Sequence, residues 1–161
     1  MAACAKGKHA AFTYEPAHAD GMLAGARSGS GNFSFVVLGK SAHAGRNPSD
    51  GRNAIVAAAA LTLELSELAS ATLSVNPAKV DGGSPNNVVP DLAIRRVNLR
   101  PADAEAQALA REKIARIAAA VQERYGAMIA VSGHFSRPAK LIDGPAANLL
   151  ETVQKAAVVS D

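Results

Sequence analysis

The spacing of the apolar residues changes period repeatedly along the chain, and this limits the folds that the chain can adopt. Residues 32–39 alternate, with Phe33, Phe35 and Val37 on one face, which predicts a strand. Residues 53–69 place apolar side chains three and four positions apart, which predicts a helix. The same test predicts strands over residues 71–79, 88–100 and 127–135, and a second helix that begins at Pro101 and ends at Gly126.

Local residue chemistry adds detail to these elements. Ser49 or Asp50 is expected to cap the first helix, because a side-chain oxygen there can accept the free N–H groups of the first turn. The apolar parity slips along residues 88–100, which predicts a β-bulge near Arg95. The apolar stripe of the first helix is expected to combine two series, Ile55, Ala59, Leu63 and Leu61, Leu65, Leu68.

The order strand, helix, strand, strand, helix, strand predicts an α+β fold. It is the βαββαβ arrangement of ferredoxin-like domains, in which two helices cover one face of a four-stranded antiparallel sheet. A short strand over residues 10–14 and a helix over residues 148–159 are predicted outside this unit. We therefore divide the chain into a lead-in (1–30), a sandwich domain (31–138) and a following segment (139–161). Because many unrelated activities occur on this fold, the function must be inferred from the site residues.

Composition argues against several functional classes. The longest apolar stretch, residues 54–63, is too short to cross a bilayer, so no membrane partner is expected. The chain has 17 Lys and Arg against 14 Asp and Glu, and residues 88–100 offer no aromatic ring for base stacking, so no nucleic-acid partner is expected. Cys4 is the single cysteine and no export signal is visible, which together predict a reducing, cytoplasmic setting.

Polar residues at the junctions of strands and loops are the candidate site residues. The triplet from His18 to Asp20 has the form of a metal-binding pair, but it lies in a polar loop without a preceding apolar strand, which favours a solvated loop. No phosphate-binding loop or nucleophile motif occurs. The remaining candidates are Glu15, His43, Asn87, Arg100 and Arg137.

These candidates lie within a series of short motifs in a recognisable order. The motifs are Gly39 to Gly45, Gly51-x-Asn53-Ala54, Gly82-Gly83-x-x-x-Asn87-Val88-Val89-Pro90, Arg100 and Arg137-Pro138. On a βαββαβ pattern, this set resembles the lid or dimerisation domain of the zinc-dependent aminoacylase and carboxypeptidase family. That family includes glutamate carboxypeptidase, acetylornithine deacetylase and succinyl-diaminopimelate desuccinylase. The resemblance covers about residues 10–158.

The resemblance implies a role for each candidate. His43 is expected to cross the dimer and to polarise the scissile carbonyl in the active site of the other copy, while Asn87 contacts the substrate. Arg137 is expected to bind a substrate carboxylate, with Arg100 as a further substrate-binding residue. Glu15 matches a carboxylate that binds one of two zinc ions in the larger catalytic domain. The segments 1–30 and 139–161 then match remnants of that catalytic domain.

The family's remaining zinc ligands have no counterpart here, because the sequence contains no Glu-Glu pair and no suitably placed His-x-Asp. We therefore expect the chain alone to be inactive, and zinc-dependent cleavage of an N-acyl amino acid or a C-terminal amino acid to belong to an intact protein. The expected partners are a small substrate with a carboxylate and a second copy, paired through residues 73–80. The alternative is a stand-alone ferredoxin-like module for small-molecule binding or interaction, without catalysis.

Overall fold

A computed structural model of the chain describes residues 6–8 and 25–158. Its described residues belong to two compact units, of which residues 28–140 form one. The other unit includes helix α4 (Gly144–Val158), which begins four residues before the helix predicted there. The strand predicted over residues 10–14 lies outside the described residues.

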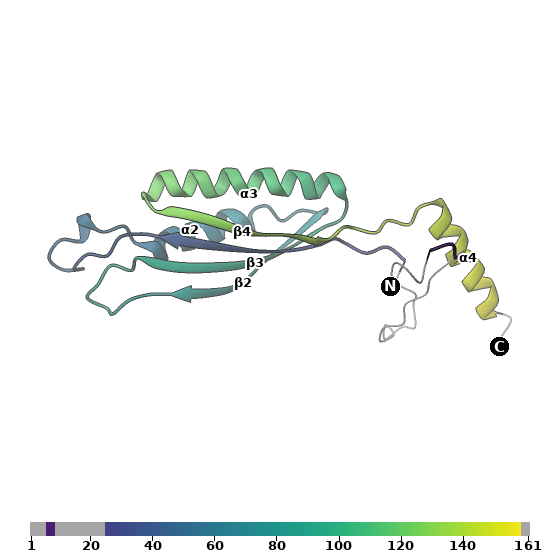
Figure 1. Cartoon of the computed structure of the whole chain (residues 1–161), viewed down its shortest axis with the longest axis horizontal. Helices are drawn as coiled ribbons and strands as arrows, with labels where there is room; N and C mark the ends of the chain where they lie inside the picture. The colour runs from purple at the N-terminus through teal and green to yellow at the C-terminus, as the bar shows by residue number, and fades with distance from the viewer. Residues whose placement is uncertain (1–5, 9–24, 159–161) are drawn as a thin grey trace. The chain divides into compact units, whose positions relative to one another are not determined.

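The unit of residues 28–140 is built on a four-stranded antiparallel sheet with the order β2-β3-β1-β4 (Figure 1). Strand β1 (Ser30–Leu38) pairs on one side with β3 (Leu92–Pro101) and on the other with β4 (Met128–Arg137). Strand β2 (Leu73–Gly82) pairs with the free side of β3. The predicted α+β, ferredoxin-like fold is confirmed.

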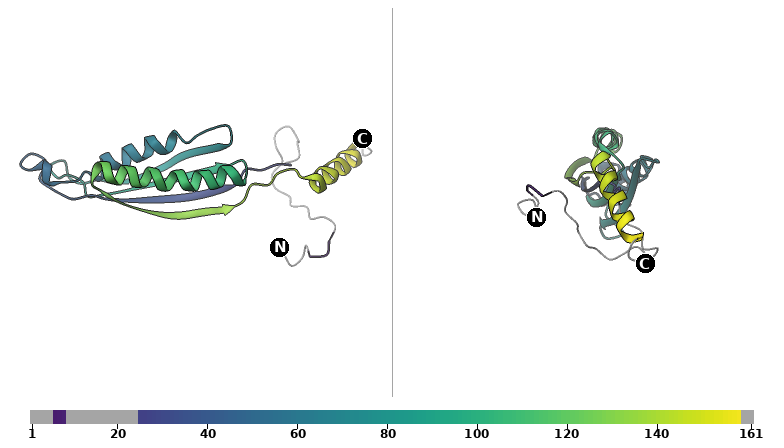
Figure 2. Two further views of the ribbon diagram at one scale, coloured as in Figure 1. Left: turned by 90° about the horizontal axis from the view of Figure 1, so that it is seen from above. Right: turned by 90° about the vertical axis from the view of Figure 1, so that its right-hand side faces the viewer.

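Two helices, α2 (Ala54–Ser66) and α3 (Ala104–Tyr125), lie side by side on one face of this sheet (Figure 2). The alternation of β1 explains this layering, because Phe33, Phe35 and Val37 point toward the helices and are buried. The buried core also contains Leu61, Leu65, Val97, Leu99, Ile114 and Val121.

The cap of α2 differs from the prediction. Ser49 and Asp50 belong to a separate short 3-10 helix, η1 (Pro48–Asp50). Asn53 is the cap, because its Oδ1 accepts hydrogen bonds from the backbone N–H groups of Ile55 at 3.0 Å and Val56 at 3.1 Å.

The buried face of α2 also differs from the prediction. Small side chains line it, since Ala54, Ala57 and Ala58 are buried and let the helix lie close to the sheet beside Leu61 and Leu65. Of the predicted series Ile55, Ala59, Leu63, only Ile55 packs against the core, whereas Ala59 is exposed and Leu63 is 68% exposed. An exposed apolar row therefore remains on the outer side of the helix, the α2 stripe, formed by Val56, Ala59 and Leu63.

Strand β3 pairs with β1 without a register shift at Arg95. Its pairing with β2 does shift opposite Arg96 and Val97, so the irregularity predicted near Arg95 lies on β2, between Pro77 and Lys79. Arg95 occupies the helix-covered face opposite Phe35, which produced the apparent slip in parity. Burial lowers the pKa of Arg95, and its Nε makes no hydrogen bond with the described residues. Residues 88–91, predicted as strand, belong instead to the loop that precedes β3.

The start of α3 also differs from the prediction. Pro101 ends β3, and Asp103 caps α3 by accepting a hydrogen bond from Ala106 N at 2.7 Å. The predicted end of the helix is confirmed, because Gly126 adopts a φ of 61°, the left-handed conformation that commonly terminates helices.

The edge strand β2 is irregular near its middle, and the edge strand β4 contains a glycine with a positive φ. In β2, the register shifts between Pro77 and Lys79. In β4, Gly133 has a φ of 120°, and a Cβ there would stand 2.1 Å from the carbonyl oxygen of Asn32.

No helix among the described residues has the length and apolar character needed to cross a bilayer.

The two faces of α2 give a matched test of the packing. Leu61→Ala removes a fully buried side chain and is expected to lower the free energy of unfolding by about 2–5 kcal/mol. Leu63→Ala removes an exposed one and should change the free energy of unfolding of the monomeric chain by less than about 0.5 kcal/mol. Urea denaturation of the 161-residue chain measures both values, and equal losses would contradict the described orientation of the helix.

Candidate functional site

Two loops meet at the end of the sheet where β1 finishes. Residues 39–51 follow β1, and residues 83–91 connect β2 to β3; we call them together the tip. They are joined by backbone hydrogen bonds, including Val89 N to Ala42 O at 2.8 Å and Ala44 N to Asn87 O at 2.9 Å. His43 and Val88 form a β-bridge between them.

The imidazole of His43 is held by backbone N–H groups. Its Nδ1 accepts hydrogen bonds from Gly45 N and Arg46 N, both at 3.1 Å. Because Nδ1 is an acceptor, the proton of the neutral ring lies on Nε2. His43 is exposed, so Nε2–H can donate a hydrogen bond to a ligand.

Side chains also fix the two loops of the tip. Ser41 Oγ donates a hydrogen bond to Asp91 Oδ2 at 2.6 Å, and Ser84 Oγ donates to Val88 O at the same length. The sequence analysis did not identify the pair of Ser41 and Asp91, because the two residues are 50 positions apart and Asp91 lies outside the motifs.

The tip brings two of the predicted site residues together. Asn87 is exposed beside the bridge that His43 makes, and its backbone oxygen accepts the hydrogen bond from Ala44 N. An imidazole N–H and a side-chain amide are therefore presented by adjacent loops.

The predicted arginines lie at the opposite end of β1. Arg137 pairs with Ser30, the first residue of β1, and its partly buried side chain has an Nε without a hydrogen bond among the described residues. Arg100 is exposed and donates a hydrogen bond from Nε to Asn98 Oδ1 at 3.0 Å. Asn98 faces Asn32 near the start of β1, so both arginines belong to this end.

The length of β1 separates the two groups of site residues. Strand β1 has 9 residues, which span about 25–30 Å at the usual rise per residue. A substrate the size of an extended dipeptide covers only about 7 Å. His43 and Arg137 of one chain therefore cannot contact the same small substrate.

The described residues do not fit a zinc site, because no three His, Cys, Asp or Glu residues gather among them. Glu15, the predicted zinc ligand, lies outside the described residues, as do His18 and Asp20. A shallow hollow beside Leu68, Thr72 and Leu109 has a volume of about 60 Å³, far below the roughly 300–1,000 Å³ of typical ligand pockets. This hollow gives no support to a small-molecule-binding module.

The contacts of His43 predict one tautomer of its ring. In the 161-residue chain at about pH 8, where histidine is normally neutral, nitrogen-15 shifts should show an unprotonated Nδ1 and a protonated Nε2 in His43. His134 is exposed on β4, and no described residue donates a backbone N–H group to its ring, so it serves as the internal control. A proton on Nδ1 of His43 would contradict the described turn.

Comparison with protein families finds a match to the Peptidase dimerisation domain over residues 25–126. This match covers more than half of the chain, including both loops of the tip and both helices that cover the sheet.

Two curated relatives match parts of the chain. One is a component of the p-aminobenzoyl-glutamate hydrolase of Escherichia coli (strain K12), 43% identical over 73 residues, which are 44% of this chain and 17% of that protein. The other is indole-3-acetyl-aspartic acid hydrolase of Enterobacter agglomerans, 34% identical over 100 residues, 60% of this chain and 23% of that protein. The matches thus cover less than a quarter of each relative's length.

Solved structures share the fold. An aminobenzoyl-glutamate utilization protein from Klebsiella pneumoniae aligns with a TM-score of 0.69 at 24% identity, over 82% of this chain and 34% of that one. The aminopeptidase PepT from Bacillus cereus aligns with a TM-score of 0.73 at 23% identity, over 83% of this chain and 36% of that one. At these identities the alignments establish a common fold.

Proposed function

The chain belongs to the Peptidase dimerisation domain family, and we propose that it is the lid and dimerisation domain of a zinc-dependent amidohydrolase whose active sites each need two copies. The observation that carries this proposal is the separation along β1. His43 and Asn87 lie at one end of the sheet and Arg137 at the other. Only two copies can bring both groups to one small substrate.

His43 has the geometry of a hydrogen-bond donor to the scissile carbonyl. With Nδ1 occupied by two N–H groups, Nε2–H can approach the carbonyl oxygen as negative charge develops there during attack by the nucleophile. The loss of one such donor typically costs about 3–4 kcal/mol of transition-state stabilisation. Asn87 is a second donor from the same tip.

Arg137 is suited to a carboxylate on the substrate. Its side chain is partly exposed, and a planar guanidinium can make two parallel hydrogen bonds to a carboxylate. Arg100, at the same end of β1, adds a second positive charge. The names of the curated relatives describe hydrolases of a glutamate conjugate and of an aspartic acid conjugate, which agrees with cleavage of an amide next to a carboxylate.

Self-association uses the side of the domain formed by β2 and α2. Strand β2 is an edge of the sheet, and α2 packs against it with the α2 stripe exposed. Val56 and Leu63 are 48% and 68% exposed, which favours their burial against a second copy.

The remaining chemistry belongs to the intact enzyme in this proposal. Zinc would be held by Glu15 together with ligands that this sequence lacks, since it has no Glu-Glu pair and no suitably placed His-x-Asp, so the 161-residue chain alone is inactive. We place the enzyme in the cytoplasm, because the single cysteine of this chain suits a reducing compartment.

Complementation between inactive variants of the intact enzyme tests the two-copy site. His43→Ala and Arg137→Ala are each expected to lose most activity. When the two variants are co-expressed, they form heterodimers in which one of the two sites has both residues. Random pairing makes about half of the dimers heterodimers, so about a quarter of wild-type activity should return.

The matched control mixes the wild type with the double variant His43→Ala, Arg137→Ala. Heterodimers of this pair have no complete site, so only the wild-type homodimers are active. The activity of the mixture should therefore fall below half that of the wild type alone. If the two single variants fail to complement each other, both residues act within one chain and the proposed arrangement is wrong.

The α2 stripe predicts the association state of the 161-residue chain. Size-exclusion chromatography with light scattering at tens of micromolar should give twice the 16.4 kDa mass of one chain. Leu63→Glu should convert it to the monomer, since a charge there would be desolvated at the interface. Leu109→Glu, at a site 47% exposed on α3, is the control and should stay dimeric. A monomeric wild type would count against the proposal.

A further inference from the structure

The turn that holds His43 also carries Arg46. Asn47 N donates a hydrogen bond to His43 O at 3.1 Å, which closes a single turn over residues 43–47. In a helical turn, residues three apart are neighbours on the surface, with about 5–6 Å between their Cβ atoms. Arg46 is thus the cationic side chain nearest to His43 along this turn, and it is exposed.

The positive charge of Arg46 is not neutralised by the acidic groups of the tip. Asp50 accepts a hydrogen bond from Asn47 Nδ2 at 2.8 Å, and Asp91 accepts one from Ser41 Oγ, so neutral donors occupy both carboxylates. None of the ion pairs formed between described residues includes Arg46.

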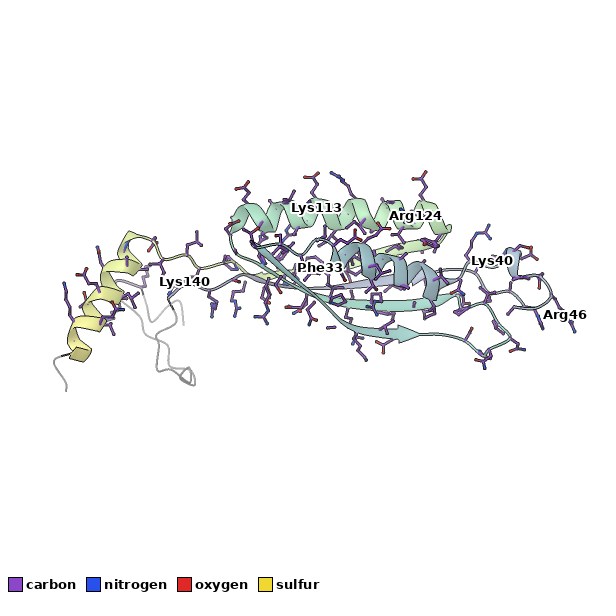
Figure 3. All side chains as sticks on the ribbon, turned by 180° about the vertical axis from the view of Figure 1, so that it is seen from behind. Phe33, Lys40, Arg46, Lys113, Arg124 and Lys140 are labelled. Carbon is purple, nitrogen blue, oxygen red and sulfur yellow. The ribbon has the colours of Figure 1, made fainter. Side chains whose placement is uncertain are left out.

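The other cations of the tip are placed differently. Arg52 is occupied, since its guanidinium donates to Ser49 O at 3.1 Å and to Gly51 O at 2.8 Å. Lys40 lies at the base of the loop, where its backbone pairs with that of Arg52. Figure 3 shows Lys40 and Arg46 at the same end of the sheet, with Arg46 farthest out and pointing away from it. Arg46 is therefore the free guanidinium beside His43.

We propose that Arg46 is a specificity-determining residue that binds a second carboxylate, on the side chain of the substrate's amino-acid part. This inference rests on the proposed function, in which His43 donates to the scissile carbonyl and Arg137 of the other copy binds the first carboxylate. An exposed guanidinium without an ion pair among the described residues, in the turn that holds His43, can bind a second carboxylate of the substrate through two parallel hydrogen bonds. The substrate class is then a conjugate of a dicarboxylic amino acid.

A pair of isosteric substrates isolates this contact. The intact enzyme is assayed with N-acyl-glutamate and N-acyl-glutamine that share one acyl group, and the ratio of their kcat/KM values is compared between variants. The wild type should prefer the glutamate conjugate. Arg46→Gln should lower the ratio by about tenfold to a hundredfold, the usual effect of a lost hydrogen bond between charged groups.

Two further variants test whether the preference depends on the positive charge of Arg46, on its paired hydrogen bonds or on its position in the turn. Arg46→Lys retains the charge but not the paired contact, so it should keep part of the preference. Lys40→Gln removes a positive charge from the same tip outside the turn and should leave the ratio unchanged. The nitrogen-15 spectrum of His43 in Arg46→Gln should match that of the wild type, because the substitution retains the backbone N–H of residue 46.

The inference is overturned by an unchanged ratio in Arg46→Gln, by an equal loss on both substrates, or by a wild type that prefers the glutamine conjugate. In each case the proposed function stands if turnover still depends on His43. An intact protein that cleaves no acyl amino acid overturns the proposed function and this inference with it.

Discussion

Strand β1 is the element on which the arrangement of the candidate site depends. It hydrogen-bonds to β3 on one side and to β4 on the other along its whole length, so neither of its ends can move toward the other without breaking two ladders. The loop that carries His43 leaves one end, and Arg137 pairs at the other. The sheet therefore holds the two groups of candidate site residues at a fixed separation.

The tip orients the imidazole of His43 with few contacts. The ring of His43 is fixed by N–H groups of its own turn rather than by another side chain. This turn is itself held in place by the β-bridge to Val88 and by the hydrogen bond from Ser41 to Asp91. Backbone donors cannot be lost by substitution, except by proline, so the tautomer of His43 depends on the path of the chain.

The fold was largely predictable from the sequence, because strand alternation and helical spacing report burial directly. The errors came where local chemistry allowed several choices. Ser49, Asp50 and Asn53 are all good cap residues, and only the path of η1 decides that Asn53 is used. Arg95 occupies a core-face position that an apolar residue usually fills, which imitated a bulge in β3.

The candidate site was predictable only in part. His43, Asn87, Arg100 and Arg137 could be selected from the sequence through their motifs, but their grouping into two distant pairs depends on the direction of β1 and its neighbours. The contacts of Ser41 and Asp91 join distant parts of the chain, and the N–H groups that hold His43 depend on backbone angles that single residues do not specify. The role proposed for Arg46 depends on the partners of the nearby carboxylates, which the sequence does not specify.

The irregularity in the edge strand β2 has a consequence for assembly. A sheet with two free margins can in principle recruit one neighbour after another and grow into a ribbon without limit. Here the register shift at Pro77 shortens the uninterrupted margin of β2. An irregular margin is a poorer template for an added strand, so this shift opposes open-ended growth along β2.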